Sequence, residues 1–154
     1  MSEDRIEKQI RIQAPRSRVW RALTDAESFG QWFGVTLQGA FAPRATLKSR
    51  IEHKGYEHVT LEMTIEQMQP EHFFSWRWHP HAIDPNFDYS AEPKTLVTFE
   101  LEEAPDGTLL KVTESGFNGI PLGRRGDAYR GNEKGWEIQV GAIQRYVTEA
   151  TQPR

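Results

Sequence analysis

The pattern of apolar and polar residues in the first third of the chain predicts one strand followed by two short helices. Isoleucines alternate with polar side chains over residues 6–12, which is the period of a half-buried strand. Pro15 suits the first turn of a helix, and apolar residues then recur at helical spacing. Asp25 is placed to cap a second helix that runs towards the aromatic pair Trp32-Phe33. We expect Gly30 to loosen the end of this helix.

The middle of the chain predicts further strands. Apolar side chains take every second position in five stretches: residues 47–52, 58–66, 74–79, 97–101 and 109–114. Gln69-Pro70-Glu71 and Asp106-Gly107 are turn sequences between successive stretches. The segment Pro80–Lys94 contains three prolines and is long for a plain connection, so we expect it to fold over an end of a cavity beside the sheet or against a second subunit.

Beyond Pro121 the apolar period changes from two to about 3.6. This pattern predicts a long amphipathic helix that begins at Trp136. Its buried stripe would be Trp136, Val140, Ile143 and Val147. An antiparallel sheet of six to seven strands, curved around this helix, would bury all the apolar faces at once. The predicted fold class is therefore α+β, with the two short helices after the first strand.

Several short motifs occur in an order that resembles one known family. They are Ala14-Pro15, the run from Val19 to Asp25, Trp32-Phe33, the run from Thr95 to Leu101, Asp106-Gly107-Thr108, Glu114-Ser115-Gly116-Phe117 and Asn132 to Trp136. In this order they resemble the START-like (SRPBCC) superfamily, in the branch of the activator of heat-shock protein 90 ATPase, over about residues 6–148. The resemblance implies a helix-grip fold with a cavity between sheet and helix. It implies no single activity, because relatives bind lipids, polyketides or hormones, or cyclise polyketides.

Composition bounds the class of protein. The chain has 154 residues, which fits one domain over 1–154. The net charge of −3 gives no excess of positive charge that would indicate nucleic-acid binding. No apolar run approaches the roughly 20 residues of a membrane span, and the charged first residues do not resemble a signal peptide. The absence of cysteine fits a reducing compartment, so we expect a cytoplasmic protein.

The sequence offers few groups for catalysis. His53, His58, His72, His79 and His81 lack recognised metal-ligand spacing, so no metal or cofactor is predicted. No nucleophile elbow or phosphate loop occurs. Glu114 shares strand parity with Leu110 and Val112 and is therefore expected to point inward, where desolvation would raise its pKa. A strand-end glutamate that escapes to solvent is the alternative, since Gly116 follows closely.

The sequence favours binding of a small hydrophobic or amphipathic molecule in a cavity between sheet and last helix. The expected lining is Trp32, Phe33, Trp76, Trp78, Phe99, Glu114, Tyr129, Trp136 and Val140, although the same aromatic residues could equally be plain core. One alternative is a co-chaperone-like module that acts on a chaperone ATPase. Another is a cyclase or hydrolase that uses Glu114 as acid or base, although the sequence supplies no second catalytic group. A homodimer also remains open.

Overall fold

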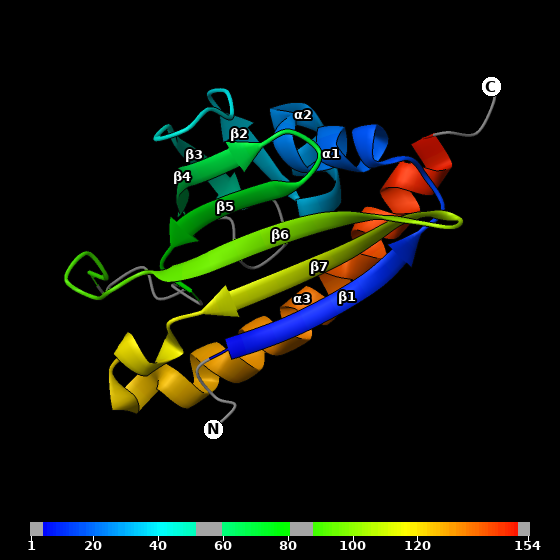
Figure 1. Ribbon diagram of the computed structural model, residues 1–154. Helices are drawn as coiled ribbons and strands as arrows, with labels where there is room; N and C mark the ends of the chain where they lie inside the picture. The colour runs from blue at the N-terminus through cyan, green and yellow to red at the C-terminus, as the bar shows by residue number, and fades with distance from the viewer. Residues whose placement is uncertain (1–4, 52–59, 81–87, 151–154) are drawn as a thin grey trace.

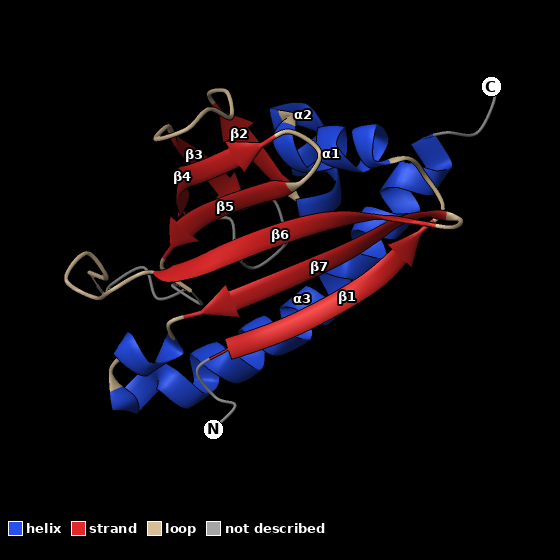
Figure 2. Ribbon diagram, viewed as in Figure 1, coloured by secondary structure: helices blue, strands red, loops and turns tan. Residues whose placement is uncertain are grey.

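The computed structural model describes residues 5–51, 60–80 and 88–150, and these form one sheet with helices on one side (Figures 1 and 2). The strands are β1 (Arg5–Ile12), β2 (Val35–Gln38), β3 (Thr46–Ile51), β4 (Thr60–Gln69), β5 (Phe73–Trp78), β6 (Thr95–Ala104) and β7 (Gly107–Ser115). The helices are α1 (Arg16–Thr24), α2 (Ala26–Phe33), a single 3₁₀ turn (Phe117–Gly119) and α3 (Leu122–Ala150). The α+β helix-grip fold expected from the sequence is confirmed.

The seven strands are all antiparallel to their neighbours, in the order β1-β7-β6-β5-β4-β3-β2. The chain therefore places its first strand beside its last, and α3 runs behind β1 and β7 (Figure 1). Strand β2 is additional to the six alternating stretches read from the sequence. Its four residues include one buried side chain, Val35, which is too little alternation to identify a strand.

The N-terminus of the second short helix is capped as the sequence predicts. The Asp25 carboxylate accepts a hydrogen bond from the Ser28 backbone N–H at 3.0 Å, which is an N-cap of α2. The expectation for Gly30 is wrong, because α2 ends at Gly34, whose φ of 89° lies in the left-handed region. Gly30 instead lies inside α2, where a Cβ would come within 2.4 Å of the Val35 carbonyl oxygen. Glycine at this position permits close packing of backbone on backbone.

Helix α3 is longer than the sequence indicated. It begins at Leu122 and runs for 29 residues, so Trp136 lies in its middle and does not open it. Four glycines among its first fourteen residues interrupt the apolar period, which explains the late start read from the sequence. The predicted stripe is confirmed, since Trp136, Val140, Ile143 and Val147 are all buried against the sheet.

Aromatic rings fill much of the space that the helices and the sheet enclose. Their centroids are 4.6–6.5 Å apart, at the spacing of packed aromatic pairs. The rings come from α2 and the loop after β2, from β5 and β6, and from α3: Phe29, Trp32, Phe33, Phe41, Phe74, Trp76, Trp78, Phe99 and Trp136.

Candidate functional site

A buried carboxylate lies at the centre of the grip. Glu114 is the second-last residue of β7, on the same face as the buried Leu110 and Val112, and its side chain is fully buried. Strand parity therefore placed it correctly between the sheet and α3. Since two such apolar neighbours offer it no hydrogen bond, its polar partners have to come from other elements.

Four neutral donors surround this carboxylate. Oxygen Oε2 accepts from the Trp78 indole Nε1 at 2.8 Å and from the Thr95 hydroxyl at 2.5 Å. Oxygen Oε1 accepts from the Trp136 indole Nε1 at 2.8 Å, and Asn132 Nδ2 donates at 2.9 Å to Oε1 and at 3.2 Å to Oε2. The carboxylate thus joins the end of β5, the start of β6, the end of β7 and the middle of α3 through hydrogen bonds.

The electrostatics of Glu114 are dominated by burial. None of the ion pairs formed by the described residues includes it, so its charge has no cation beside it. Desolvation raises the pKa of Glu114 above its ordinary value of 4.5, and the hydrogen bonds from Thr95, Trp78, Trp136 and Asn132 oppose that shift. The Thr95 hydroxyl can also turn to accept a hydrogen bond from the O–H of the neutral acid, so both protonation states can be satisfied.

Three tryptophans, Trp76, Trp78 and Trp136, pack beside this carboxylate and are called the wall below. The ring centroids of Trp76 and Trp78 lie 5.9 Å apart, and that of Trp136 lies 6.3 Å and 6.1 Å from them. Phe33 and Phe99 extend the wall, with centroids 6.5 Å and 5.8 Å from Trp136. These five members of the expected lining therefore come together around Trp136.

One polar atom in this wall lacks a partner among the described residues. The indole Nε1 of Trp76 is buried, and no group in the described part of the chain accepts its hydrogen bond. The contrast with Trp32 is direct, because the Trp32 indole donates to the Ala22 carbonyl oxygen at 2.8 Å. An unmet buried donor costs about 1–3 kcal/mol, which makes the Trp76 N–H a candidate contact for an acceptor atom brought from outside. Sequence reasoning placed Trp76 in the wall but could not find the unmet donor, which depends on all its neighbours.

The other expected lining residues lie around this centre. Val140 is buried one helical turn after Trp136. Trp32 packs edge-on against Phe33 at a centroid distance of 5.6 Å. Tyr129 packs its ring against Phe117 and donates its hydroxyl to the Arg5 carbonyl oxygen at 3.0 Å, so this hydroxyl bonds to the backbone of β1. The sequence did not foresee this contact between the edge strand and α3.

The segment between β5 and β6 is partly described. Its residues His81, Ile83 and Phe87 lie outside the described residues, so the expected fold of the segment over the cavity stays a prediction. At its far end the Arg124 guanidinium lies 4.7 Å from the centre of the Tyr89 ring. The same guanidinium makes an ion pair with Glu92 at 2.7 Å, so this end of the segment is fixed to the first turn of α3.

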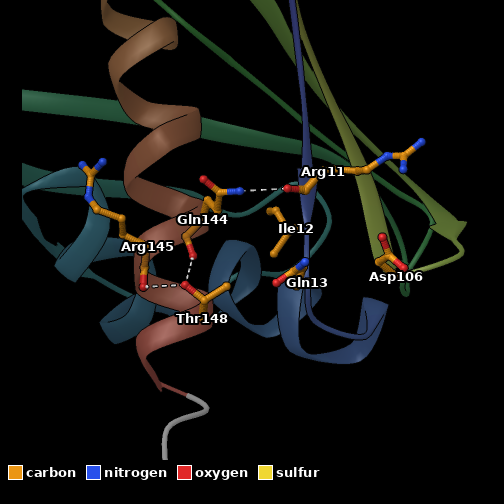
Figure 3. A pocket seen from close by; sticks show the side chains of 7 residues that line it. All are labelled: Arg11, Ile12, Gln13, Asp106, Gln144, Arg145 and Thr148. Carbon is orange, nitrogen blue, oxygen red and sulfur yellow. Dashed lines mark hydrogen bonds between the residues drawn. The ribbon is translucent and has the colours of Figure 1, made fainter.

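A surface pocket of about 330 Å³ lies elsewhere, where the end of β1, the β6–β7 turn and the last turns of α3 meet (Figure 3). It is lined by Arg11, Ile12, Gln13, Asp106, Gln144, Arg145 and Thr148. The guanidinium groups of Arg11 and Arg145 point away from each other in Figure 3, and Gln144 donates to the Arg11 carbonyl oxygen at 2.9 Å. The sequence analysis did not single out this region.

The described residues contain no group of three or more histidine, aspartate or glutamate side chains arranged to hold a metal ion. His79 contacts the Glu92 carbonyl oxygen at 3.0 Å, while His53, His58 and His81 fall outside the described residues. No helix in the described part of the chain is long and apolar enough to cross a membrane.

Solved structures share this architecture. The protein MLL2253 from Mesorhizobium loti aligns with a TM-score of 0.76 at 23% identity, over 97% of this chain and 99% of that one. The Aha1 dimer from Colwellia psychrerythraea gives 0.71 at 18% identity, over 93% and 95%. DynU16, from the dynemicin biosynthetic locus, gives 0.71 at 22% identity and covers 94% of this chain but 47% of its own length. At these identities the likeness establishes the fold.

Comparison of sequences establishes the family. No curated protein matches the chain. The profile of the family described as "Activator of Hsp90 ATPase homolog 1-like protein" matches residues 13–148, which include both short helices, the buried Glu114 and most of α3. The chain therefore belongs to the Activator of Hsp90 ATPase homolog 1-like family, within the START-like superfamily.

Proposed function

We propose that the protein binds a small amphipathic molecule between α3 and the sheet, with an acceptor oxygen of that molecule opposite the Trp76 indole N–H. The observation that carries the proposal is this buried donor, for which the described residues supply no acceptor. A ligand carbonyl or ether oxygen that accepts from it would remove a desolvation cost of about 1–3 kcal/mol. The apolar part of the ligand would gain about 25 cal/mol for each Å² that it buries.

The carboxylate has a separate role in this proposal. By accepting from both indoles, Glu114 fixes the orientation of the Trp78 and Trp136 rings, which form two sides of the site. Because the rings are packed in the structure, they have to separate before a ligand can lie between them. The hydrogen bonds to Glu114 then guide the rings back to one geometry, which gives the site its shape.

Acid or base catalysis is a weaker reading of the same residue. Both oxygens of Glu114 already accept from two or more donors, so a substrate would have to displace one of them before it could exchange a proton. We therefore assign Glu114 a role in shaping the site.

The direct test is titration with two neutral fluorescent dyes. Prodan carries a ketone oxygen, whereas N-phenyl-1-naphthylamine has a similar apolar body without a carbonyl. We expect both to bind, and Trp76→Phe to weaken Prodan by about three- to tenfold, the value of one hydrogen bond, with little change for the second dye. Trp32→Phe is the matched control, because its indole already has an acceptor. Failure of both dyes to bind would contradict the proposal.

The family match favours a second candidate, in which the surface of the domain acts on a chaperone ATPase. A solved relative is an Aha1 dimer, so this candidate also includes a homodimer. Stimulation of the ATPase of a purified Hsp90 by the protein, unaffected by Trp76→Phe, would favour the surface role over ligand binding. The absence of cysteine supports a cytoplasmic location for either role.

A further inference from the structure

The buried carboxylate lies beneath two segments that pack on each other. Gly116, directly after β7, has a φ of 102°, and a Cβ there would lie 3.7 Å from the Thr95 Cα. At Gly119 a Cβ would lie 3.0 Å from the Pro93 ring. The end of the β5–β6 segment therefore rests on the β7–α3 connection, immediately beside the residue whose hydroxyl donates to Glu114.

Arg124 joins these segments from the first turn of α3. Its guanidinium donates from Nη2 to Glu92 Oε1 at 2.7 Å and from Nε to Oε1 at 3.0 Å and to Oε2 at 3.2 Å, so two donors of the fork meet both carboxylate oxygens. Its Nη1 donates to the Pro80 carbonyl oxygen at 3.0 Å. One side chain thus holds residues near both ends of the β5–β6 segment.

The burial of this pair separates it from an ordinary surface ion pair. The Glu92 side chain is 7% exposed and that of Arg124 is 20% exposed. On the same helix the Arg130–Asp127 pair has side chains that are 72% and 73% exposed. Loss of one partner of a buried pair leaves the other charge unmet, whereas an exposed pair contributes little.

The position of Arg124 on α3 links it to the Glu114 donors. Arg124, Asn132 and Trp136 follow one another at spacings of eight and four residues, so they lie along one side of the helix, with the fully buried Ala128 between. The other two donors come from the strand ends that the Arg124 contacts hold, since Trp78 ends β5 and Thr95 begins β6. All four donors are therefore attached to elements that Arg124 joins.

We propose that Arg124 is a positioning residue whose contacts with Glu92 and Pro80 hold the hydrogen-bond network of Glu114 closed and control access to the site between α3 and the sheet. This inference rests on the proposed function for its ligand, but the closed state of the network can be measured without one. Opening of the Arg124 contacts frees the ends of β5 and β6 from the first turn of α3, and the indoles of Trp78 and Trp136 are then exposed to solvent.

The test is to measure by NMR the rate of hydrogen exchange of the indole N–H groups in the ligand-free protein. In Glu92→Gln and Arg124→Lys we expect exchange at Trp78 and Trp136 to accelerate about tenfold through local opening, because lysine lacks the fork and glutamine lacks the charge. Exchange at Trp32, whose acceptor lies in α1, is expected to stay unchanged. Arg130→Gln is the matched control on the same helix and is expected to change none of the three.

Two results would overturn the inference. Unchanged exchange at Trp78 and Trp136 would show that the Arg124 contacts do not hold the network closed. Equal acceleration at Trp32 would show a general loss of stability instead of local opening.

Prodan kinetics then separate this inference from the proposed function. We expect the association and dissociation rates to rise together in Glu92→Gln, with the dissociation constant changed less than about threefold, because access changes while the bound contacts do not. If exchange accelerates only at Trp78 and Trp136 but the dye binds to no variant, the result would support the role of Arg124 in holding the network closed and contradict the proposed ligand site. If exchange accelerates only at Trp78 and Trp136 while the association and dissociation rates of the dye stay unchanged, Arg124 does not control access to the site.

Discussion

The indole N–H of Trp136 on α3 donates to Glu114 Oε1 on β7 across 2.8 Å, and this bond joins the long helix to the sheet at a fully buried carboxylate. The ring of Trp136 also packs against Phe99 and Trp76 at centroid distances of 5.8 Å and 6.3 Å. The residue therefore combines an apolar contact and a hydrogen bond to a charged group.

We predict that Trp136→Ala lowers the free energy of unfolding by about 3–5 kcal/mol, because it leaves a large cavity and removes one of the two donors to Glu114 Oε1. Trp136→Phe keeps most of the ring contact and should cost less, yet more than a surface substitution, because the donor is still lost. Urea unfolding of both variants measures this. Equal, small losses in both would contradict the packing described here.

The hydroxyl of Thr95 gives a sharper test of the network. Thr95→Val is nearly isosteric and removes one donor to Glu114, which we expect to cost about 1.5–3 kcal/mol, the range for a hydrogen bond to a charged group. Thr46→Val is the matched control, because Thr46 Oγ1 meets Thr64 Oγ1 at an exposed position. Urea unfolding should separate the two variants, and equal losses would contradict a strong bond at Thr95.

The raised pKa of Glu114 makes stability depend on pH. Burial favours the neutral acid in the folded protein, so the folded state keeps a proton above pH 4.5 that the unfolded chain has lost. The free energy of unfolding should therefore fall as the pH rises from 4.5 through the folded-state pKa. Glu114→Gln lacks this titration, and the stability of the wild type relative to this variant should decline across the same window.

Urea unfolding of the wild type and Glu114→Gln at several pH values measures this decline. A wild type that instead gains stability over the variant as the pH rises would mean that the four donors outweigh desolvation. The direction of the pKa shift would then be wrong.

Two glycines should respond to alanine in opposite directions. A Cβ at Gly135 in α3 meets nothing within 4 Å, so Gly135→Ala should stabilise the protein by about 0.5–1 kcal/mol. At Gly107 in the β6–β7 turn φ is 151°, and a Cβ would lie 2.2 Å from the Ile12 carbonyl oxygen, so Gly107→Ala should destabilise it. Thermal unfolding of the two variants checks the signs, and a shift in the same direction would contradict this geometry.

Much of the scaffold could be predicted from the sequence because every strand except β2 follows an alternating pattern of apolar and polar residues. Parity alone placed Glu114 on the inner face with Leu110 and Val112, and the same argument placed Trp76 and Trp78 together. The first turns of α3 were missed because their contacts are polar and distant in sequence. Arg124 pairs with Glu92, for example, and neither residue is apolar.

The partners within the site could not be predicted in the same way. Asn132 lies on a helix and Thr95 begins a strand, and only the long-range register of β6 with β7 and the docking of α3 bring both to Glu114. Tyr129 was expected as a lining residue, and the bond of its hydroxyl to the backbone of β1 has no signature in the sequence. The unmet Trp76 N–H depends on the same packing and has no signature in the sequence.

The most direct test of the proposed site is the NMR signal of the Trp76 indole N–H during addition of Prodan. We predict a shift to lower field that saturates with dye binding, because the N–H gains an acceptor, while the Trp32 signal stays in place because it already donates to Ala22. Saturating dye that leaves the Trp76 signal unmoved would contradict an acceptor at this position and with it the proposed ligand site.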